Sequence, residues 1–321
     1  MEKQFVVGVD VGGQTSKIGV VDAQGNILAQ TVIRSDTYGA DFDKFAASLA
    51  DGIKSCIAEA GKEGQVRGIG VGAPNGNYYT GEIAFAPNLA WAANKAVKFS
   101  KTLSNNLGGI PVSLTNDANA AAVGEMTYGA ARGMKNFIMI TLGTGVGSGI
   151  VIDGKMVYGH DGFAGELGHT IIDRAENARV CGCGRKGCLE AYCSATGVSR
   201  TAYEWLAASD EPSLLRNYEK ISAKDVFDCA KQGDKMAKRI FDYTGTLLGR
   251  QLAEFIAFSA PEAIILFGGL ARNKEFLTEP ITKAMNENVL PLWKNKVKII
   301  YTELKESDAA ILGASALAWE L

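Results

Sequence analysis

Three cysteines and one histidine have the spacing of a metal site. They follow the pattern His-x11-Cys-x-Cys-x4-Cys, with His169, Cys181, Cys183 and Cys188 as the candidate ligands. Zinc is held tetrahedrally by Cys₃His sets of this composition, and interleaved glycines allow a short loop to fold around an ion. These glycines are Gly182, Gly184 and Gly187. We therefore expect structural Zn²⁺ in the loop formed by residues 169–188.

Other uses of the cysteines fit the sequence less well. A thioredoxin-type redox site needs Cys-x-x-Cys, which the cluster lacks. Cys193 is an alternative fourth ligand in place of His169, although it falls in a segment expected to be helical. Cys56 and Cys229 lie within helical patterns, where cysteine acts as a small core residue. The cluster is therefore best interpreted as a structural metal site that holds its own loop in place.

A carboxylate in SLTNDANAAA, residues 113–122, is the candidate for proton transfer. Asn116 and Asp117 are expected where a strand ends and an alanine-rich helix starts. From these residues alone, capping of the helix is the simpler role for Asp117. The alternative is a general base that takes a proton from a substrate hydroxyl, with Asn116 binding another hydroxyl.

Two glycine-rich turns follow apolar strands, in DVGGQTSK at residues 10–17 and LGTGVGSG at residues 142–149. Such turns present backbone N–H groups to an anion, and glycine lets the backbone approach a phosphate closely. Neither is a Walker A loop or a GxGxxG motif. Each alone is equally consistent with a hairpin turn, but together with FGGL at 267–270 they favour nucleotide binding. Asp10 is expected to hold Mg²⁺ through water, or else to bond its own turn.

The strands around these turns occur twice. Residues 5–28 and 137–157 both predict a strand, a glycine turn, a second strand, a tight turn and a third strand. The two copies begin 132 residues apart, at 5 and at 137. This recurrence predicts a duplicated architecture with two similar lobes.

The remaining segments alternate between helical and strand patterns, which favours an α/β fold with partly parallel sheets. We expect helices at 41–60, 91–107, 118–131, 223–231, 235–258 and 307–319, and strands at 66–71, 111–114, 263–267 and 297–302. The crossing between the lobes is expected near residues 116–118.

Composition limits the class of protein. The chain has 321 residues, 47% of them hydrophobic and 21% charged, with a formal net charge of −2. This size favours two lobes, and the charge gives no reason to expect nucleic acid or a membrane as partner. The N-terminus has no secretion signal, and the most apolar stretch, residues 252–271, is interrupted by Glu254, Pro261 and Glu262. We expect a cytoplasmic protein, in which disulfides seldom persist.

The motifs DVGG, TNDANAAA, LGTGVGSG, GELGH and CGCGRKGCLE, in this order, resemble the ROK family of sugar kinases and repressors. That family belongs to the actin-like ATPase and hexokinase superfamily. The resemblance implies two ribonuclease-H-like lobes with a cleft between them for sugar and ATP. It implies a small lobe at 1–116, completed by a C-terminal helix at 307–321, and a large lobe at 117–306 that contains the zinc loop.

The resemblance also implies roles for individual residues. Asp117 would be the base that activates the primary hydroxyl of the sugar. The matching sugar ligands are Asn88, Asn116, Asp117, Glu166, His169 and Glu190. His169 would serve twice, binding zinc through one ring nitrogen and sugar through the other.

The expected ATP contacts are spread over three turns. They are Asp10, Gly12, Gly13, Gln14, Thr15, Lys17, Gly143, Thr144, Gly145, Gly147, Gly268 and Gly269. Gln14 departs from the family, which commonly has threonine directly after the two glycines; here Thr15 comes one position later. The departure leaves open which side chain meets the β- or γ-phosphate.

The expected activity is transfer of the γ-phosphate of ATP to the 6-hydroxyl of glucose. N-acetylglucosamine, N-acetylmannosamine, mannose, fructose and allose stay open as substrates, because loop residues 74–82 decide which groups fit at position 2 of the sugar. Polyphosphate stays open as the donor. A repressor is disfavoured because only four residues precede the first strand, and a non-catalytic sugar sensor conflicts with the phosphate turns. The resemblance implies a homodimer or homotetramer.

Overall fold

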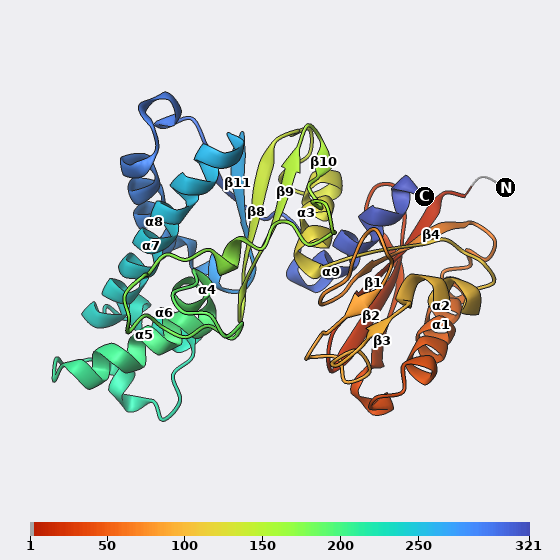
Figure 1. Ribbon diagram of the computed structural model, residues 1–321, viewed down its shortest axis with the longest axis horizontal. Helices are drawn as coiled ribbons and strands as arrows, with labels where there is room; N and C mark the ends of the chain where they lie inside the picture. The colour runs from red at the N-terminus through yellow and green to blue at the C-terminus, as the bar shows by residue number, and fades with distance from the viewer. Residues whose placement is uncertain (1–2) are drawn as a thin grey trace. The chain divides into compact units, whose positions relative to one another are not determined.

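The structure is a computed structural model that describes residues 3–321, in which the chain forms two compact units (Figure 1). The first comprises the described residues up to Met134 together with Met156–Ala164 and Glu303–Leu321. The second comprises Lys135–Lys155 and Gly165–Thr302. The first unit is therefore built from three separate parts of the chain.

The first unit contains a sheet with the order β3-β2-β1-β4-β7. Its strands are β1 (Phe5–Val11), β2 (Thr15–Val21), β3 (Ile27–Arg34), β4 (Val66–Gly72) and β7 (Val112–Thr115). The pairs β1/β2 and β2/β3 are antiparallel, whereas β1/β4 and β4/β7 are parallel. A separate two-stranded sheet joins β5 (Ile83–Ala84) to β6 (Ala96–Val97).

The second unit repeats this plan with the order β10-β9-β8-β11-β12. Its strands are β8 (Phe137–Leu142), β9 (Val146–Ile152), β10 (Lys155–Met156), β11 (Ala263–Phe267) and β12 (Lys298–Tyr301). The hairpin pair β8/β9 is antiparallel, and β8/β11 and β11/β12 are parallel, as in the first sheet. The duplicated α/β architecture predicted from the glycine turns is thus confirmed.

Helices cover both sheets. The first unit contains α1 (Phe42–Glu59), α2 (Phe99–Asn106), α3 (Asp117–Tyr128) and α9 (Glu306–Ala316). The second contains α4 (Glu190–Cys193), α5 (Ala195–Ala208), α6 (Ala223–Lys231), α7 (Lys235–Ser259) and α8 (Lys274–Asn288). Within residues 3–321, none of these helices combines the length and the apolar character that a bilayer crossing requires.

The helix α9 lies directly on β1 and β4, as Figure 1 shows for the blue helix beside the red strand β1. Two strand glycines make this close approach possible. A Cβ atom added at Gly8 would lie 2.0 Å from the carbonyl oxygen of Ile311, and one added at Gly70 would lie 1.8 Å from that of Ala314. Backbone therefore packs on backbone here, which larger residues would prevent.

Two expectations differ from the structure. The helix expected at 91–107 begins only at Phe99, because Trp91 belongs to a buried loop whose indole stacks on Phe45 at 4.9 Å between ring centroids. The chain also passes from the first unit to the second at Met134–Lys135 rather than near residues 116–118. The reason is that α3 packs against α9, with its Gly124 close to the backbone of Gly313.

Candidate functional site

Two carboxylates lie near each other in the first unit. Asp10 is at the end of β1, where it pairs across the sheet with Lys17 and Gly72. Asp117 begins α3, and a Cβ atom on Gly72 would lie 3.7 Å from the Asp117 Cα atom. Burial, and then the negative charge of Asp117, raise the pKa of Asp10 to about 6, while Lys17 opposes the shift.

The side chain of Asp117 reaches solvent, but protein atoms surround most of its carboxyl group. The resulting loss of hydration raises the pKa of Asp117 above its usual value, and hydrogen bonds from backbone N–H groups only partly offset this rise. Its Oδ1 accepts a bond of 2.9 Å from the N–H group of Ala118. Asn116, rather than Asp117, caps the helix, since its Oδ1 accepts a 2.7 Å bond from the N–H group of Asn119. The simple capping role considered for Asp117 therefore belongs to its neighbour.

The first glycine turn joins β1 to β2. Gly12 donates its N–H group to the carbonyl oxygen of Thr15 at 3.0 Å, which closes the turn. A Cβ atom on Gly13 would lie 2.5 Å from the carbonyl oxygen of Asn88, so the turn and the expected sugar ligand are adjacent. Gln14 is exposed at the tip. The structure thus brings Asn88 to the first glycine turn through a contact that only glycine permits.

The second glycine turn joins β8 to β9. The N–H group of Gly143 donates to the carbonyl oxygen of Gly145 at 3.0 Å. The start of α5 holds the outer side of the turn: Ala195 donates its N–H group to Gly143 at 2.8 Å, and the Thr196 hydroxyl donates to the carbonyl oxygen of Thr144 at 2.8 Å. These contacts of α5 could not be predicted from the sequence, because they join residues 52 positions apart.

The three remaining predicted glycines are Gly147, Gly268 and Gly269. Gly147 lies inside β9, where its N–H group bonds the Thr141 hydroxyl at 3.1 Å, so it belongs to the strand rather than to the turn. Gly268 follows β11 with a φ of 99°, and a Cβ atom there would lie 2.6 Å from the carbonyl oxygen of Leu142. Among residues 3–321, no atom beyond the two neighbouring residues lies within 4 Å of where a Cβ atom of Gly269 would be.

Val146 is the point where the second turn, the GELGH motif and Glu190 meet. Its N–H group donates to Glu190 Oε2 at 2.9 Å. Its carbonyl oxygen lies 1.9 Å from where a Cβ atom of Gly168 would be, so the 3-10 turn that bears Glu166 and His169 packs directly on β9. Glu190 is therefore engaged with the turn, in addition to the sugar contact implied by its family resemblance.

The four predicted metal ligands come together. One ligand atom from each of His169, Cys181, Cys183 and Cys188 lies within 4.8 Å of all the others. The Sγ atoms of Cys183 and Cys188 are 3.7 Å apart, as are Cys181 Sγ and His169 Nδ1. Tetrahedral ligands at zinc bond lengths of about 2.0–2.3 Å lie about 3.3–3.8 Å from one another. The donor set therefore fits zinc in both chemistry and spacing.

The other cysteines lie elsewhere in the core. Cys193 Sγ contacts the carbonyl oxygen of Thr244 at 3.6 Å, which removes it as a ligand of this cluster. Cys56 and Cys229 are buried in α1 and α6, as expected for core residues. In the cluster itself, burial raises the pKa of the Cys181 thiol to about 12. Zinc binding must therefore displace thiol protons.

The predicted residues form two groups, each within one unit. The first unit holds Asp10, Gly12, Gly13, Gln14, Thr15, Lys17, Asn88, Asn116 and Asp117. The second holds Gly143, Thr144, Gly145, Gly147, Glu166, His169, Cys181, Cys183, Cys188, Glu190, Gly268 and Gly269. Each group combines a glycine turn with candidate sugar ligands.

Comparison with known proteins places these motifs in one family. The model of the ROK family matches residues 6–320. A glucokinase of Thermotoga maritima is 34% identical over 324 residues, covering 100% of this chain and 99% of the relative. A xylose repressor of Caldicellulosiruptor bescii is 27% identical, covering 97% of this chain and 77% of the repressor. The crystal structure of a ROK family glucokinase from Streptomyces griseus in complex with glucose and AMPPNP has a TM-score of 0.77 and 31% identity, covering 99% of this chain and 100% of that one.

Proposed function

The chain belongs to the ROK family, and from this premise we propose that it is an ATP-dependent glucokinase. The proposed reaction transfers the γ-phosphate of ATP to the 6-hydroxyl of glucose and releases glucose 6-phosphate and ADP. The full-length similarity to glucokinases supports a hexose kinase, and the two glycine turns fit the phosphates of a nucleotide. Because the reaction consumes ATP, we propose that the protein works in the cytoplasm.

The observation that carries this proposal is the state of Asp117. Its carboxylate is exposed and has a raised pKa, and its Oδ1 accepts a backbone hydrogen bond from Ala118. A general base needs a free oxygen and a pKa shifted toward the operating pH. Asp117 would take the proton of the 6-hydroxyl while the hydroxyl oxygen attacks the γ-phosphorus of ATP. ADP would depart on the opposite side.

The sugar would be held by amide, carboxylate and imidazole side chains. We propose that Asn88, Asn116, Glu166, His169 and Glu190 bind its hydroxyls. His169 offers Nδ1 to the cysteine cluster, which leaves Nε2 for a hydroxyl. In this scheme the metal fixes the ring orientation and the tautomer of His169. The loop of residues 169–188 thereby contributes to sugar affinity without touching the phosphates.

Phosphoryl transfer relies on positioning and charge neutralisation more than on covalent chemistry. The backbone N–H groups of the two glycine turns would contact the phosphates. Asp10 would hold Mg²⁺ through water, and its pKa of about 6 leaves the carboxylate mainly ionised at pH 7. When bound, Mg²⁺ neutralises the charge on the β- and γ-phosphates.

The first test is ADP release with Mg-ATP across glucose, mannose, fructose, allose, N-acetylglucosamine and N-acetylmannosamine. We expect the highest kcat/KM with glucose. A higher kcat/KM with another sugar would be consistent with the same kinase mechanism, and loop residues 74–82 would then be the next to substitute as determinants of sugar specificity. Replacing ATP by polyphosphate tests the donor. Absence of turnover with every sugar and both donors would contradict the proposed function and favour a sugar sensor.

The pH profile gives a separate prediction. Asp117 acts as a base only when ionised, so kcat/KM should be full above its pKa and fall as the pH drops through it. Because burial raises this pKa, the fall should begin at a higher pH than about 4, the value for a solvated aspartate. The measurement is kcat/KM from about pH 4 to 8, at about half-unit steps, with circular dichroism showing that the protein stays folded. A flat profile over this range would argue against Asp117 as the base.

A further inference from the structure

Arg179 is a buried cation beside the metal cluster. It is 6% exposed and is the only basic residue in the buried set among residues 3–321 whose side chains are described. It lies two positions before Cys181 in the chain. Burial of a charged side chain is costly unless it is well paired, so a buried arginine at this place calls for a specific role.

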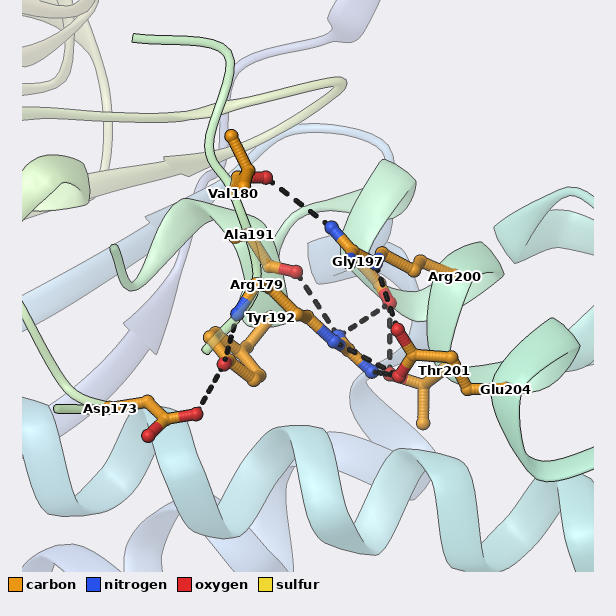
Figure 2. A network of polar contacts seen from close by, with 9 residues as sticks. All are labelled: Asp173, Arg179, Val180, Ala191, Tyr192, Gly197, Arg200, Thr201 and Glu204. Atoms are coloured by element: carbon orange, nitrogen blue, oxygen red, sulfur yellow. Dashed lines mark hydrogen bonds and ion pairs between the residues drawn. The ribbon is translucent and has the colours of Figure 1, made fainter. Parts of the chain in front are cut away.

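The guanidinium group joins the loop to two helices, as Figure 2 shows. Nη1 donates to the carbonyl oxygen of Ala191 at 3.1 Å, next to Glu190 at the start of α4, and to that of Gly197 at 3.3 Å in α5. Nη2 donates to the Thr201 hydroxyl at 2.9 Å, and Nε to Glu204 Oε2 at 3.1 Å. The planar fork of arginine can meet these partners at once, whereas a lysine ammonium cannot.

The backbone of Arg179 positions the metal loop directly. Its carbonyl oxygen accepts a 2.8 Å bond from the N–H group of Gly187, the residue before Cys188. Its own N–H group donates at 3.1 Å to the hydroxyl of Tyr192, which in turn donates to Asp173. The Tyr192 ring lies 4.5 Å from the guanidinium carbon. Arg179 is therefore held through both its backbone and its side chain, close in the loop to the ligands Cys181 and Cys188.

The same side chain reaches the second glycine turn through one more contact. Arg179 holds Gly197 in the first turn of α5, and the neighbouring Thr196 bonds the carbonyl oxygen of Thr144. Glu190 bonds Val146 at the other end of that turn. The metal loop, Glu190 and the second glycine turn are thus all linked, through hydrogen bonds, to the buried guanidinium group of Arg179.

We propose that Arg179 is a positioning residue that preorganises the Cys₃His loop for zinc and sets the placement of Glu190. The zinc part of this inference is independent of the proposed activity, whereas the Glu190 part rests on it. Outer partners that orient metal ligands typically contribute about 10- to 100-fold to metal affinity. Arg179 acts on the backbone that carries the ligands rather than on a ligand side chain.

The test compares Arg179→Lys with Arg200→Lys in the zinc-loaded protein. Arg200 is a matched control because it also bonds Glu204 and donates to the carbonyl oxygen of Val180, but is exposed. Zinc transfer to a chromogenic chelator is followed for both. We expect Arg179→Lys to lower zinc affinity about 10- to 100-fold and Arg200→Lys to leave it near that of the unsubstituted protein. Tyr192→Phe, which loses the hydroxyl but keeps the ring, should give a smaller loss and serves if Arg179→Lys fails to fold.

Sugar kinetics at saturating zinc test the second part of the proposal, that Arg179 sets the placement of Glu190. Arg179→Lys should raise the KM for sugar more than the KM for ATP, because Ala191 adjoins Glu190. If the variant only lowers the midpoint of thermal unfolding, with zinc release and the KM ratio unchanged, Arg179 is a general stabilising residue and the proposal is overturned. Faster zinc release in a protein that phosphorylates no sugar would uphold the zinc role and contradict only the proposed function.

Discussion

Asp117→Asn should abolish nearly all sugar phosphorylation while sugar binding persists. Asparagine keeps the size of the side chain and its place at the start of α3, but it cannot accept the proton of the 6-hydroxyl. General base catalysis is worth about 100- to 10,000-fold, and we expect kcat to fall within that range. ADP release gives kcat, and calorimetry with sugar alone gives the dissociation constant.

Asp43→Asn is the matched control for this substitution. Asp43 is likewise an aspartate in the first turn of a helix, in α1. Loss of its charge costs the same favourable interaction with the helix dipole, without touching the proposed site. We expect its kcat to match that of the unsubstituted protein. A loss below about tenfold in Asp117→Asn would contradict the base assignment.

Cys183→Ser should release zinc and weaken sugar binding. A neutral serine hydroxyl is a poor replacement for a thiolate, and three ligands hold the ion less well than four. The loss of zinc affinity should exceed the about 10- to 100-fold typical of an outer partner, because Cys183 is itself a ligand in our assignment. Without metal, His169 loses its fixed orientation, so the KM for sugar should rise while that for ATP changes less.

Cys229→Ala controls for the removal of a thiol. Cys229 lies in the core of α6, outside the cluster, and its substitution should leave the zinc content unchanged. Metal analysis of both purified variants, followed by calorimetric titration with glucose, gives the comparison. Full sugar affinity in zinc-free Cys183→Ser would show that the loop is not coupled to the sugar site.

The fold was predictable where local patterns carry it. Both hairpins were recognised from an apolar strand, a glycine turn and a second strand, because strand periodicity and turn chemistry are local. The segment that begins at Trp91 was wrongly predicted as a helix, because a buried loop can space its apolar residues as closely as a helix does. The helices α5 and α8 were not anticipated; α8 contains Pro280, which is a signal against a helix interior.

The site was predictable in its residue types but not in its contacts. His169 and the three cysteines could be recognised because metal ligation restricts both chemistry and spacing. The bond between Glu190 and Val146 joins positions 44 residues apart, and only the tertiary fold places the first residue of α4 beside the first residue of β9. Arg179 was missed for the same reason, because a lone arginine in a loop is usually solvated.

The discontinuity of the first unit has a consequence for biosynthesis. Residues 303–321 are made after the whole second unit, yet α9 covers β1 and β4 through the glycine contacts at Gly8 and Gly70. Until α9 leaves the ribosome, these strands expose an uncovered apolar face, while the second unit already has all its residues. The first unit is therefore completed last, although N-terminal parts of a chain usually fold first. A chain truncated before residue 303 would contain every residue of the second unit and lack part of the first.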